Sequence, residues 1–579
     1  LRDGAPGVLD RGQIDRLEKI DPGNARLREL WGEIEKAGAV KLLWLNPSLP
    51  YYEPGAPFDH EGAKRFTKRL VFSNWMVVPK AVSSVLSYLT EQALFDAGGR
   101  GPHSYEDQAR TAGSLKTLFR LGRVAPSFAL VYPSRTLSEI GDPLISAGRF
   151  SGPRASEEVL EAITGKLREP LARIEHHGDR EGKPDQAWYW AAPILLDAEE
   201  DREKTIRFLD EMYAEDPAFR GEESPDDDDD TETQWSRCLE AAKSLLDGEL
   251  SLGRQPDDLA EVMAKLALGG FGNCGYRSLT RNAGSDEDRA RTGGLITGLA
   301  LRAMFNLPHA THLLQSLQAR RSGPKDALWQ ECLDYAIAGN LQATLDEFTH
   351  LLIESQGSDR EDGEEAAEVT TARAMTDAIG LRTTTTSASF FDLEGDQTVE
   401  RERKRLRTRF AASFVKGQSD DAQEVERVEH LRSAFNSPFW PFILTSTSVG
   451  QEGLDFHLYC HAVVHWNLPS NPVDLEQREG RVHRYKNHAV RRNLALVYGE
   501  ATLRNAAESD EGEVWEQLFK AGEDTRPDDQ TDLWPYWLFA PDADGANPFL
   551  IERHVMAMAL SRDEANLQAL LKSLVLYRS

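Results

Sequence analysis

The stretch ILTSTSVGQEGLDFHLYCHAVVHWNLPSNPVDLEQREGRVHRYKNHAVRRN, residues 443–493, decides the fold of this chain. The apolar run at 442–444 predicts a short buried strand that breaks into a loop rich in hydroxyl groups and glycine. A second apolar run at 462–466 ends in the polar segment 467–472. Ligands bind at the carboxyl ends of parallel strands in α/β sheets. The two strands therefore predict an α/β fold with a ligand-facing edge.

Two arginines follow these strands in the run QREGRVHR, residues 477–484. Arg481 and Arg484 come after Gly480, and a spacing of three is expected to place both guanidinium groups on one face of a helix. Arginine stays charged at any working pH, and its planar fork of donors fits phosphate oxygens. Gly480 lets the chain pass close to a bulky group. The run therefore indicates a site that meets a polyphosphate.

This region resembles the C-terminal RecA-like lobe of superfamily 2 helicases and translocases, with the SWI/SNF and bacterial RapA-like branch as the nearer relatives. Residues 445–456 look like helicase motif V, and residues 477–484 look like motif VI. Residues 467–472 resemble the element between these motifs in the SWI/SNF branch. The resemblance implies part of a nucleic-acid-dependent ATPase, with DNA or RNA as the partner and ATP with Mg²⁺ as the cofactor.

The resemblance also implies roles for single residues. Arg481 and Arg484 would be arginine fingers that reach the γ-phosphate of ATP, where such an arginine is worth ~10³–10⁵ in rate. Gln477 would help to position the nucleotide or the attacking water. Gly453 and Asp455 would couple the state of the nucleotide to the grip on nucleic acid, and Gly480 is also expected near the nucleotide. The candidates for contacts to the phosphate backbone of nucleic acid are Thr445, Ser446 and Thr447.

An earlier stretch, RLVFSNWMVVPKAVSSVLSYL at 69–89, predicts a strand followed by a helix. A buried-type strand at 70–73 is followed by apolar residues at helical spacing from Val82 to Leu89. This unit resembles helicase motif IV, which opens the second lobe. Ser73 and Asn74 would then lie at the carboxyl edge of the strand, where nucleic acid could pass.

Motif IV lies near residue 71 and motif V near residue 445, and an unstructured loop of that length is implausible in a compact domain. Helical periodicity between the motifs predicts a folded, mostly α-helical insertion. We therefore expect an α/β, RecA-like parallel-sheet lobe interrupted by this insertion, with a small α-rich C-terminal segment. The expected boundaries are 1–39 for a helical lead-in, 40–144 for the first part of the lobe, 145–375 for the insertion, 376–505 for the second part of the lobe and 506–579 for the C-terminal segment.

The net charge of the chain is −28, from 67 Lys and Arg against 95 Asp and Glu. An acidic net charge does not suit a protein that coats nucleic acid by bulk charge, so any contact with nucleic acid must come from local basic patches. The densest patch is RERKRLRTR at 401–409, which we expect to be helical. Arg405 and Arg407 within it are candidates for nucleic-acid contact, and the alternative is a solvated face paired with neighbouring glutamates. The acidic block EESPDDDDDTET at 222–233 predicts a solvated loop.

The four cysteines are scattered without zinc or disulfide spacing, which fits a reducing cytoplasm. No apolar run approaches 18 residues and no signal peptide is found, so no membrane role is expected.

A working ATPase needs a phosphate-cradling loop, G-x-x-x-x-G-K-S/T, and an acidic metal site. Neither pattern is found: DEFTH at 346–350 and DEAN at 563–566 mimic an acidic box, but both lie in predicted amphipathic helices. We expect the ATP-binding first lobe to be absent from this chain and supplied in cis or in trans, and the isolated chain to be inactive as an ATPase. Two hypotheses remain open. The chain is a motor lobe whose helical insertion contacts a protein partner, or it is a non-catalytic helicase-like module that binds nucleic acid or protein.

Overall fold

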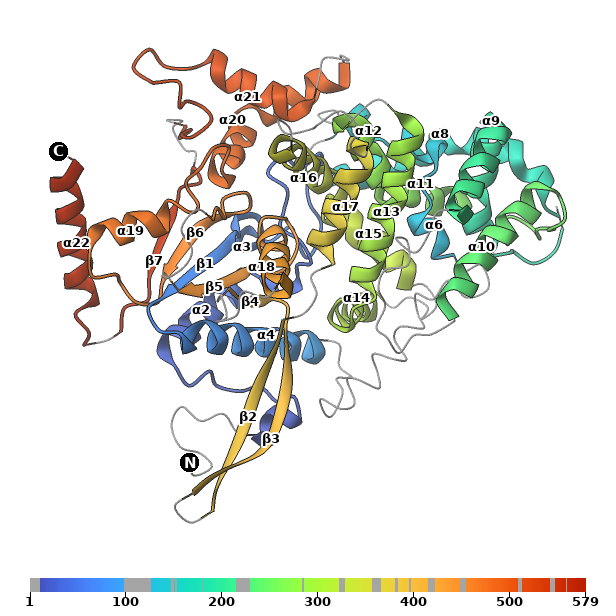
Figure 1. Cartoon of the computed structure of the whole chain (residues 1–579). Coiled ribbons are helices and arrows are strands. Elements are labelled where there is room, and N and C mark those ends of the chain that lie inside the picture. Colours follow the sequence, from blue (N-terminus) through green and yellow to red (C-terminus); the bar gives the residue numbers. More distant parts are fainter. Residues whose placement is uncertain are drawn as a thin grey trace.

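The computed structural model describes residues 11–97, 126–146, 150, 152, 154–179, 181–214, 230–283, 286–321, 328–356, 366–380, 384–394, 397–414, 422–447, 454–508, 513–541, 547–558 and 560–578. A five-stranded sheet runs through this part of the chain in the order β4-β5-β1-β6-β7 (Figure 1), and every neighbouring pair of strands is parallel. The expected α/β class with a parallel sheet is confirmed. The strands are β1 (Lys68–Ser73), β4 (Ala411–Phe414), β5 (Ile443–Thr447), β6 (Cys460–His465) and β7 (Glu552–Val555).

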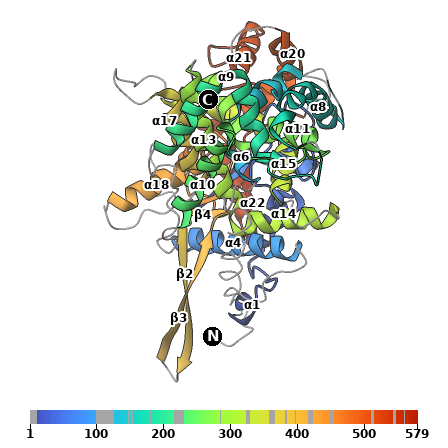
Figure 2. The same ribbon diagram turned by 90° about the vertical axis from the view of Figure 1, so that its right-hand side faces the viewer.

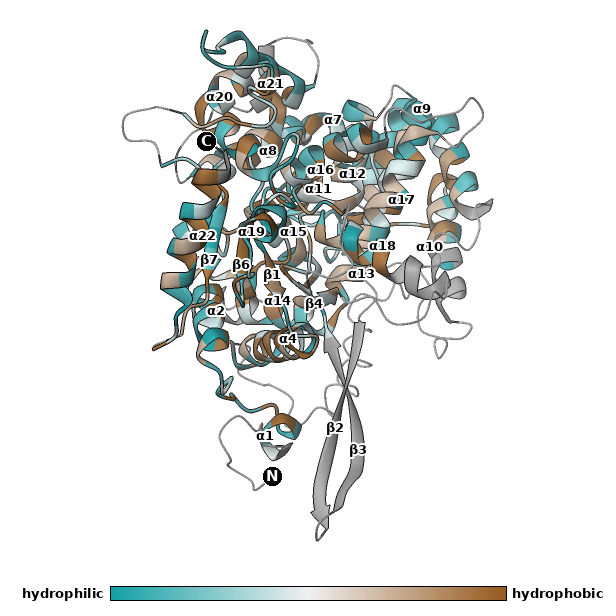
Figure 3. Ribbon diagram, turned by 60° about the vertical axis from the view of Figure 1, so that its left-hand side comes forward, coloured by the Kyte–Doolittle hydropathy of each residue, from teal (hydrophilic) through white to brown (hydrophobic). Residues whose placement is uncertain are grey.

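Strand β1 is the centre of the sheet, where Val71 lies opposite Thr445 of β5 and Val464 of β6. All residues of β1, β5 and β6 are buried, as expected for parallel strands covered on both faces. Figure 3 shows hydrophobic colour along β1 and β6. Leu70 and Phe72 pack with helix α18 (Ala422–Phe435) on one face, and α4 (Val77–Ala97) covers the other face beside β4 and β5.

Between α4 and the next strand in sequence, the described residues form a group of helices, as the periodicity predicts. Figure 1 shows these helices on one side of the sheet, and Figure 2 views the molecule from that side. They are α6 (Phe128–Val131), α7 (Arg135–Ile140), α8 (Ala155–Ile174), α9 (Trp188–Ala214), α10 (Asp230–Leu246), α11 (Leu259–Gly269), α12 (Phe271–Asn282), α13 (Glu287–Phe305), α14 (Pro308–Arg321), α15 (Leu328–Ala338), α16 (Leu341–Gln356) and α17 (Ala367–Ile379). The loop prediction for the acidic block is wrong for residues 230–233, which belong to α10, and residues 222–229 lie outside the described chain.

A buried ion pair joins the helices to the sheet region. Glu347 of α16 accepts a hydrogen bond from Nε of Arg491 at 2.9 Å, and both side chains are almost fully buried. The same carboxylate accepts from the main-chain N–H of Ser48 at 2.8 Å and from its hydroxyl at 2.7 Å. The acidic pair of the DEFTH run therefore lies within a helix, as expected, and Glu347 holds two segments of the chain together.

The basic run at 401–409 is not a helix, and that prediction is wrong. Strands β2 (Thr384–Glu394) and β3 (Gln397–Thr408) form a separate antiparallel pair. In this register Arg405 lies opposite Ser387, and Arg407 lies opposite Thr385. The partner strand, rich in threonine and aromatic residues, supplies the main-chain hydrogen bonds of a ladder, which outweigh the weak helical preference of Arg, Lys and Glu.

Residues 506–579 are not only α-rich, because β7 adds the fifth strand to the sheet. Val464 of β6 lies opposite His554, and the pKa of His554 is raised to about 9 by hydrogen bonds with Glu33 and Glu552. Since Glu33 belongs to α2 (Ala25–Lys36), this helix meets β7 at the edge of the sheet. The remaining helices are α1 (Arg11–Asp15), α2 (Ala25–Lys36), α3 (Glu61–Arg65), α19 (Pro472–Glu479), α20 (His488–Glu508), α21 (Val514–Asp524) and α22 (Asp563–Arg578).

The cysteines are buried free thiols. In the part of the chain that the structure describes, no helix combines the length and the apolar character of a membrane span.

Candidate nucleotide and nucleic-acid site

The QREGRVHR run begins in helix α19 and leaves it before the two arginines. Asn471 caps the helix by accepting a hydrogen bond from the N–H of Asp474 at 2.8 Å, and the helix ends at Glu479. Arg481 and Arg484 follow in a turn, so the prediction that they share a helix face is wrong. Val482, in the same turn, is buried in a cluster with Leu70 and Phe72 of β1.

The turn brings Arg481 and Arg484 to the segment that precedes β6. Nε of Arg484 donates to Oδ1 of Asp455 at 2.8 Å, and both side chains are about one-third exposed. Nη1 of Arg481 donates to the carbonyl of Leu454 at 3.2 Å, while the N–H of Phe456 donates to the carbonyl of Arg481 at 2.9 Å. The structure thus brings together Asp455, Arg481 and Arg484.

The other residues expected at the nucleotide are placed differently. Gln477 is an exposed residue of α19. Gly480 forms the C-cap of that helix, and a Cβ at this position would approach the carbonyl of Glu476 to 3.2 Å. Gly453 lies outside the described residues.

Ser73 and Asn74 lie at the carboxyl end of β1, in a network built by the buried Arg478. Nη2 of Arg478 donates to Oδ1 of Asn74 at 2.6 Å, and Nη1 donates to the carbonyl of Asn467 at 2.8 Å. The hydroxyl of Ser73 donates to Oδ1 of Asn467 at 3.0 Å. Arg478 is only 3% exposed, its guanidinium lies 5.5 Å from the centre of the Phe72 ring, and burial lowers its pKa from the ordinary value.

Sequence reasoning missed Arg478 and Asn467 as parts of this site. One signal was available, because Arg478 comes three residues after Leu475 in α19 and both share the buried face of that helix.

The hydroxyl residues of β5 lie inside the sheet. The Thr445 hydroxyl donates to the carbonyl of Pro79 at 2.8 Å, and the Ser446 hydroxyl donates to the carbonyl of Phe414 at 2.9 Å. Thr447 ends the strand and is also buried. The first two hydroxyls bind main-chain groups in this arrangement, so a contact with nucleic acid would require them to change partner. Arg405 and Arg407 belong to β3, which pairs with β2 and not with the parallel sheet.

These residues fit only part of an ATP and Mg²⁺ site. The guanidinium groups of Arg481 and Arg484 lie at one turn and suit phosphate oxygens. The described residues contain no group of three or more His, Cys, Asp or Glu side chains that could hold a metal ion. The arrangement can neutralise phosphate charge, and binding of the nucleotide base and of Mg²⁺ requires further groups.

Residues 379–486 match the family model of the helicase conserved C-terminal domain. The match includes β5, β6 and α19 as well as both arginines, and it supports a helicase-type C-terminal lobe. Searches of curated proteins and of solved structures give no match.

Proposed function

We propose that this chain supplies the C-terminal motor lobe of a nucleic-acid-dependent ATPase, a helicase or translocase related to the SWI/SNF or RapA-like branch. The observation that carries the proposal is the contact between Arg484 and Asp455, which joins motif VI to motif V at 2.8 Å. A nucleotide-binding lobe, in cis or in trans, would hold ATP and Mg²⁺. The proposed site of action is the cytoplasm, where free cysteines stay reduced.

The arginines would supply positive charge across the cleft between the two lobes. ATP supplies a γ-phosphoryl group whose transfer to water spreads negative charge over the phosphate oxygens. The ion pair of Arg484 with Asp455 is partly exposed, and such pairs contribute about 0–1 kcal/mol. Arg484 can therefore leave Asp455 for a polyphosphate at little cost, while Arg481 extends from the same turn.

Arg478 offers a path from the nucleotide to the nucleic acid. It belongs to α19, the helix that leads into the arginine turn, and its guanidinium holds Asn74 and Asn467 at the edge of the sheet. Movement of α19 when the arginines meet phosphate would shift Asn74. Ser73, Asn74 and Thr447 at the end of β5 would then change their contacts with the nucleic-acid strand. The helices α6–α17 would form the insertion that recognises a protein partner.

The test is an Arg481→Ala and an Arg484→Ala variant in protein reconstituted with its nucleotide-binding lobe. Nucleic-acid-stimulated ATP hydrolysis is expected to fall by about 10³-fold or more, because the negative charge of the transition state loses the guanidinium that stabilises it. Arg504→Ala is the matched control, since Arg504 forms an exposed pair with Glu500 on α20. A fall of less than a few-fold in both variants would reject the arginine-finger role.

One observation favours a second candidate, a non-catalytic helicase-like binding module. Both arginines already donate to groups of their own chain, Asp455 and the carbonyl of Leu454. In this case the chain would bind nucleic acid equally well with and without ATP, and no added lobe would produce turnover. Measuring nucleic-acid affinity in the presence of a non-hydrolysable nucleotide separates the two candidates.

A further inference from the structure

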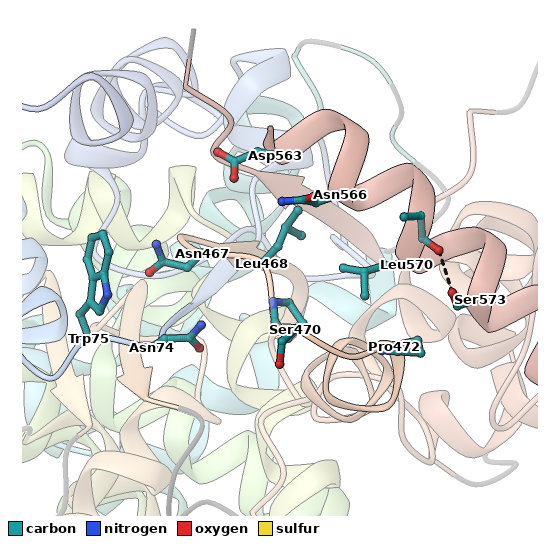
Figure 4. A pocket seen from close by; sticks show the side chains of 12 residues that line it. Asn74, Trp75, Asn467, Leu468, Ser470, Pro472, Asp563, Asn566, Leu570 and Ser573 are labelled. Atoms are coloured by element: carbon teal, nitrogen blue, oxygen red, sulfur yellow. Dashed lines mark hydrogen bonds between the residues drawn. The ribbon is translucent and has the colours of Figure 1, made fainter. Parts of the chain in front are cut away.

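A pocket with a volume of about 620 Å³ lies at the carboxyl ends of β1 and β6. Figure 4 shows Asn74, Trp75 and Asn467 on one side of it and helix α22 on the other. Leu570 anchors α22 by packing against Leu475 of α19. The volume is typical of pockets that enclose small molecules or single groups of a larger ligand.

The side-chain amides of Asn74 and Asn467 in this pocket are oriented by hydrogen bonds to their carbonyl oxygens. Arginine has only donors, so Asn74 must present its carbonyl oxygen to Arg478. The Ser73 hydroxyl accepts from the N–H of Trp75 at 3.1 Å and therefore has its own hydrogen available for the carbonyl oxygen of Asn467. Neither amide NH₂ group donates a hydrogen bond within the described residues. Asn74 and Asn467 thus offer oriented donors to a ligand.

Trp75 adds a flat apolar surface beside these donors. Its side chain is 59% exposed, although its main chain is held by Ser73, and it has no ring contact among the described residues. Indole rings of this size are usually buried to a large extent. An exposed indole beside fixed donors is suited to stacking on a planar ligand.

The charges around the pocket exclude a phosphate as its main ligand. None of the described residues that line it is Lys or Arg. The lining contains one carboxylate, Asp563, which binds Nη2 of Arg26 at 3.1 Å. A phosphate would find no positive side chain there, whereas an uncharged planar ring with acceptor atoms would meet both the indole and the amides.

We propose that this pocket takes one unpaired base of a nucleic-acid strand. Trp75 stacks on the face of the base, and the NH₂ groups of Asn74 and Asn467 donate to acceptor atoms on its edge. The inference rests on the proposed function, because it needs a nucleic-acid strand at this edge of the sheet. It adds a contact to a base to the phosphate-backbone contacts expected of Thr445, Ser446 and Thr447.

The experiment compares two fluorescent single strands of equal length by anisotropy, using the full chain. One strand carries mixed bases, and the other carries the same sugar-phosphate backbone with every base removed. Trp75→Ala is expected to weaken binding of the strand with bases by about 5- to 100-fold, as loss of one stacking contact does, and to leave the abasic strand unchanged. Trp75→Phe should restore most of the affinity. Met76→Ala is the matched control, because Met76 is 58% exposed and lies outside the pocket lining.

Asn74→Asp removes the amide NH₂ group and keeps the hydrogen bond from Arg478. The new carboxylate still accepts from Arg478, but it has no N–H to donate, so binding of the strand with bases should weaken more than binding of the abasic strand. The base pocket would be overturned, and the proposed function left standing, if the unmodified protein bound both strands with equal affinity and Trp75→Ala did not change either affinity. Failure of the unmodified protein to bind either strand would overturn both.

Discussion

Arg484 and Asp455 are joined by a hydrogen bond of 2.8 Å between Nε and Oδ1, and this contact links the turn after α19 to the segment before β6. Asp455 therefore sets the direction in which the guanidinium extends. Because both side chains are about one-third exposed, the pair positions Arg484 without contributing much to stability.

The first prediction concerns Asp455→Ala, which removes the acceptor that positions Nε of Arg484 before ATP binds. The free energy of unfolding should change by less than about 1 kcal/mol, because partly exposed ion pairs contribute little. ATP hydrolysis by the reconstituted motor should fall by about 10- to 100-fold, because a misplaced catalytic group loses a factor of this order. Urea unfolding and steady-state ATPase measurements check the two parts. An unchanged ATPase rate would show that Asp455 does not position Arg484.

The second prediction concerns Arg405 and Arg407 on β3. They occupy alternate positions of this strand. If each meets a phosphate, replacing each with alanine should make the slope of log affinity against log salt shallower by about 0.9 on duplex DNA, or by about 0.7 on a single strand. Arg154→Ala is the control, because Arg154 is exposed at the start of α8 and paired with Glu157. Salt slopes equal to that of the unmodified protein would remove both residues from the interface.

The third prediction concerns the buried pair of Glu347 and Arg491. Glu347→Gln should destabilise the protein by about 3–5 kcal/mol, because it leaves the guanidinium of Arg491 buried without its counter-charge. Urea unfolding followed by circular dichroism measures the loss. Glu500→Gln removes an exposed partner of Arg504 and should change stability by less than about 1 kcal/mol. Similar effects of the two substitutions would contradict the role of burial.

The fourth prediction is a pH dependence at Glu513. Burial, together with Glu516 and Asp346, raises the pKa of Glu513 from 4.5 to about 8, although Lys486 opposes the shift. Its Oε2 lies 2.7 Å from Nδ1 of His350, whose pKa burial lowers to about 4, so the two groups meet as a neutral pair near neutral pH. A carboxyl with a raised pKa stabilises the folded protein fully below its unfolded pKa. That contribution is lost as the pH rises through the folded value.

Between pH 7 and pH 9 the unmodified protein should therefore lose about 1 kcal/mol more stability than Glu513→Gln. This window lies above the ordinary pKa of histidine, so His350 stays neutral in both states. Unfolding by urea at several pH values gives the difference. Parallel stability curves for the two proteins would show that Glu513 titrates normally.

Much of the sheet could be predicted from the sequence because its inner strands are continuous apolar runs. Residues 442–444 and 462–466 read as buried strands, and they fall within or beside β5 and β6. Strand β7 could not be found in this way. Its sequence is Glu-Arg-His-Val and it is half-exposed, since an edge strand needs main-chain pairing more than apolar side chains.

The candidate site was predictable where chemistry follows from residue type and not where it follows from burial. Arg481 and Arg484 could be selected because two arginines after a glycine suggest phosphate contact. Arg478 stands in the same run, yet its role depends on Asn74, which lies 404 positions away in sequence. No local pattern indicates that pairing. The end of α19 was missed as well, and Val482 just beyond it packs in a cluster with residues of strands that are distant in sequence.

The central position of β1 has a consequence for synthesis of the chain. Its neighbours β5 and β6 begin at Ile443 and Cys460, long after β1 ends at Ser73. A ribosome adds about 5–20 residues each second, so β1 waits on the order of 20 to 75 seconds for a partner. During that time its apolar side chains and unpaired main-chain groups could join another nascent chain. Helix α4 follows β1 directly in the chain and packs against it, so it emerges first and can shield β1 until the sheet closes.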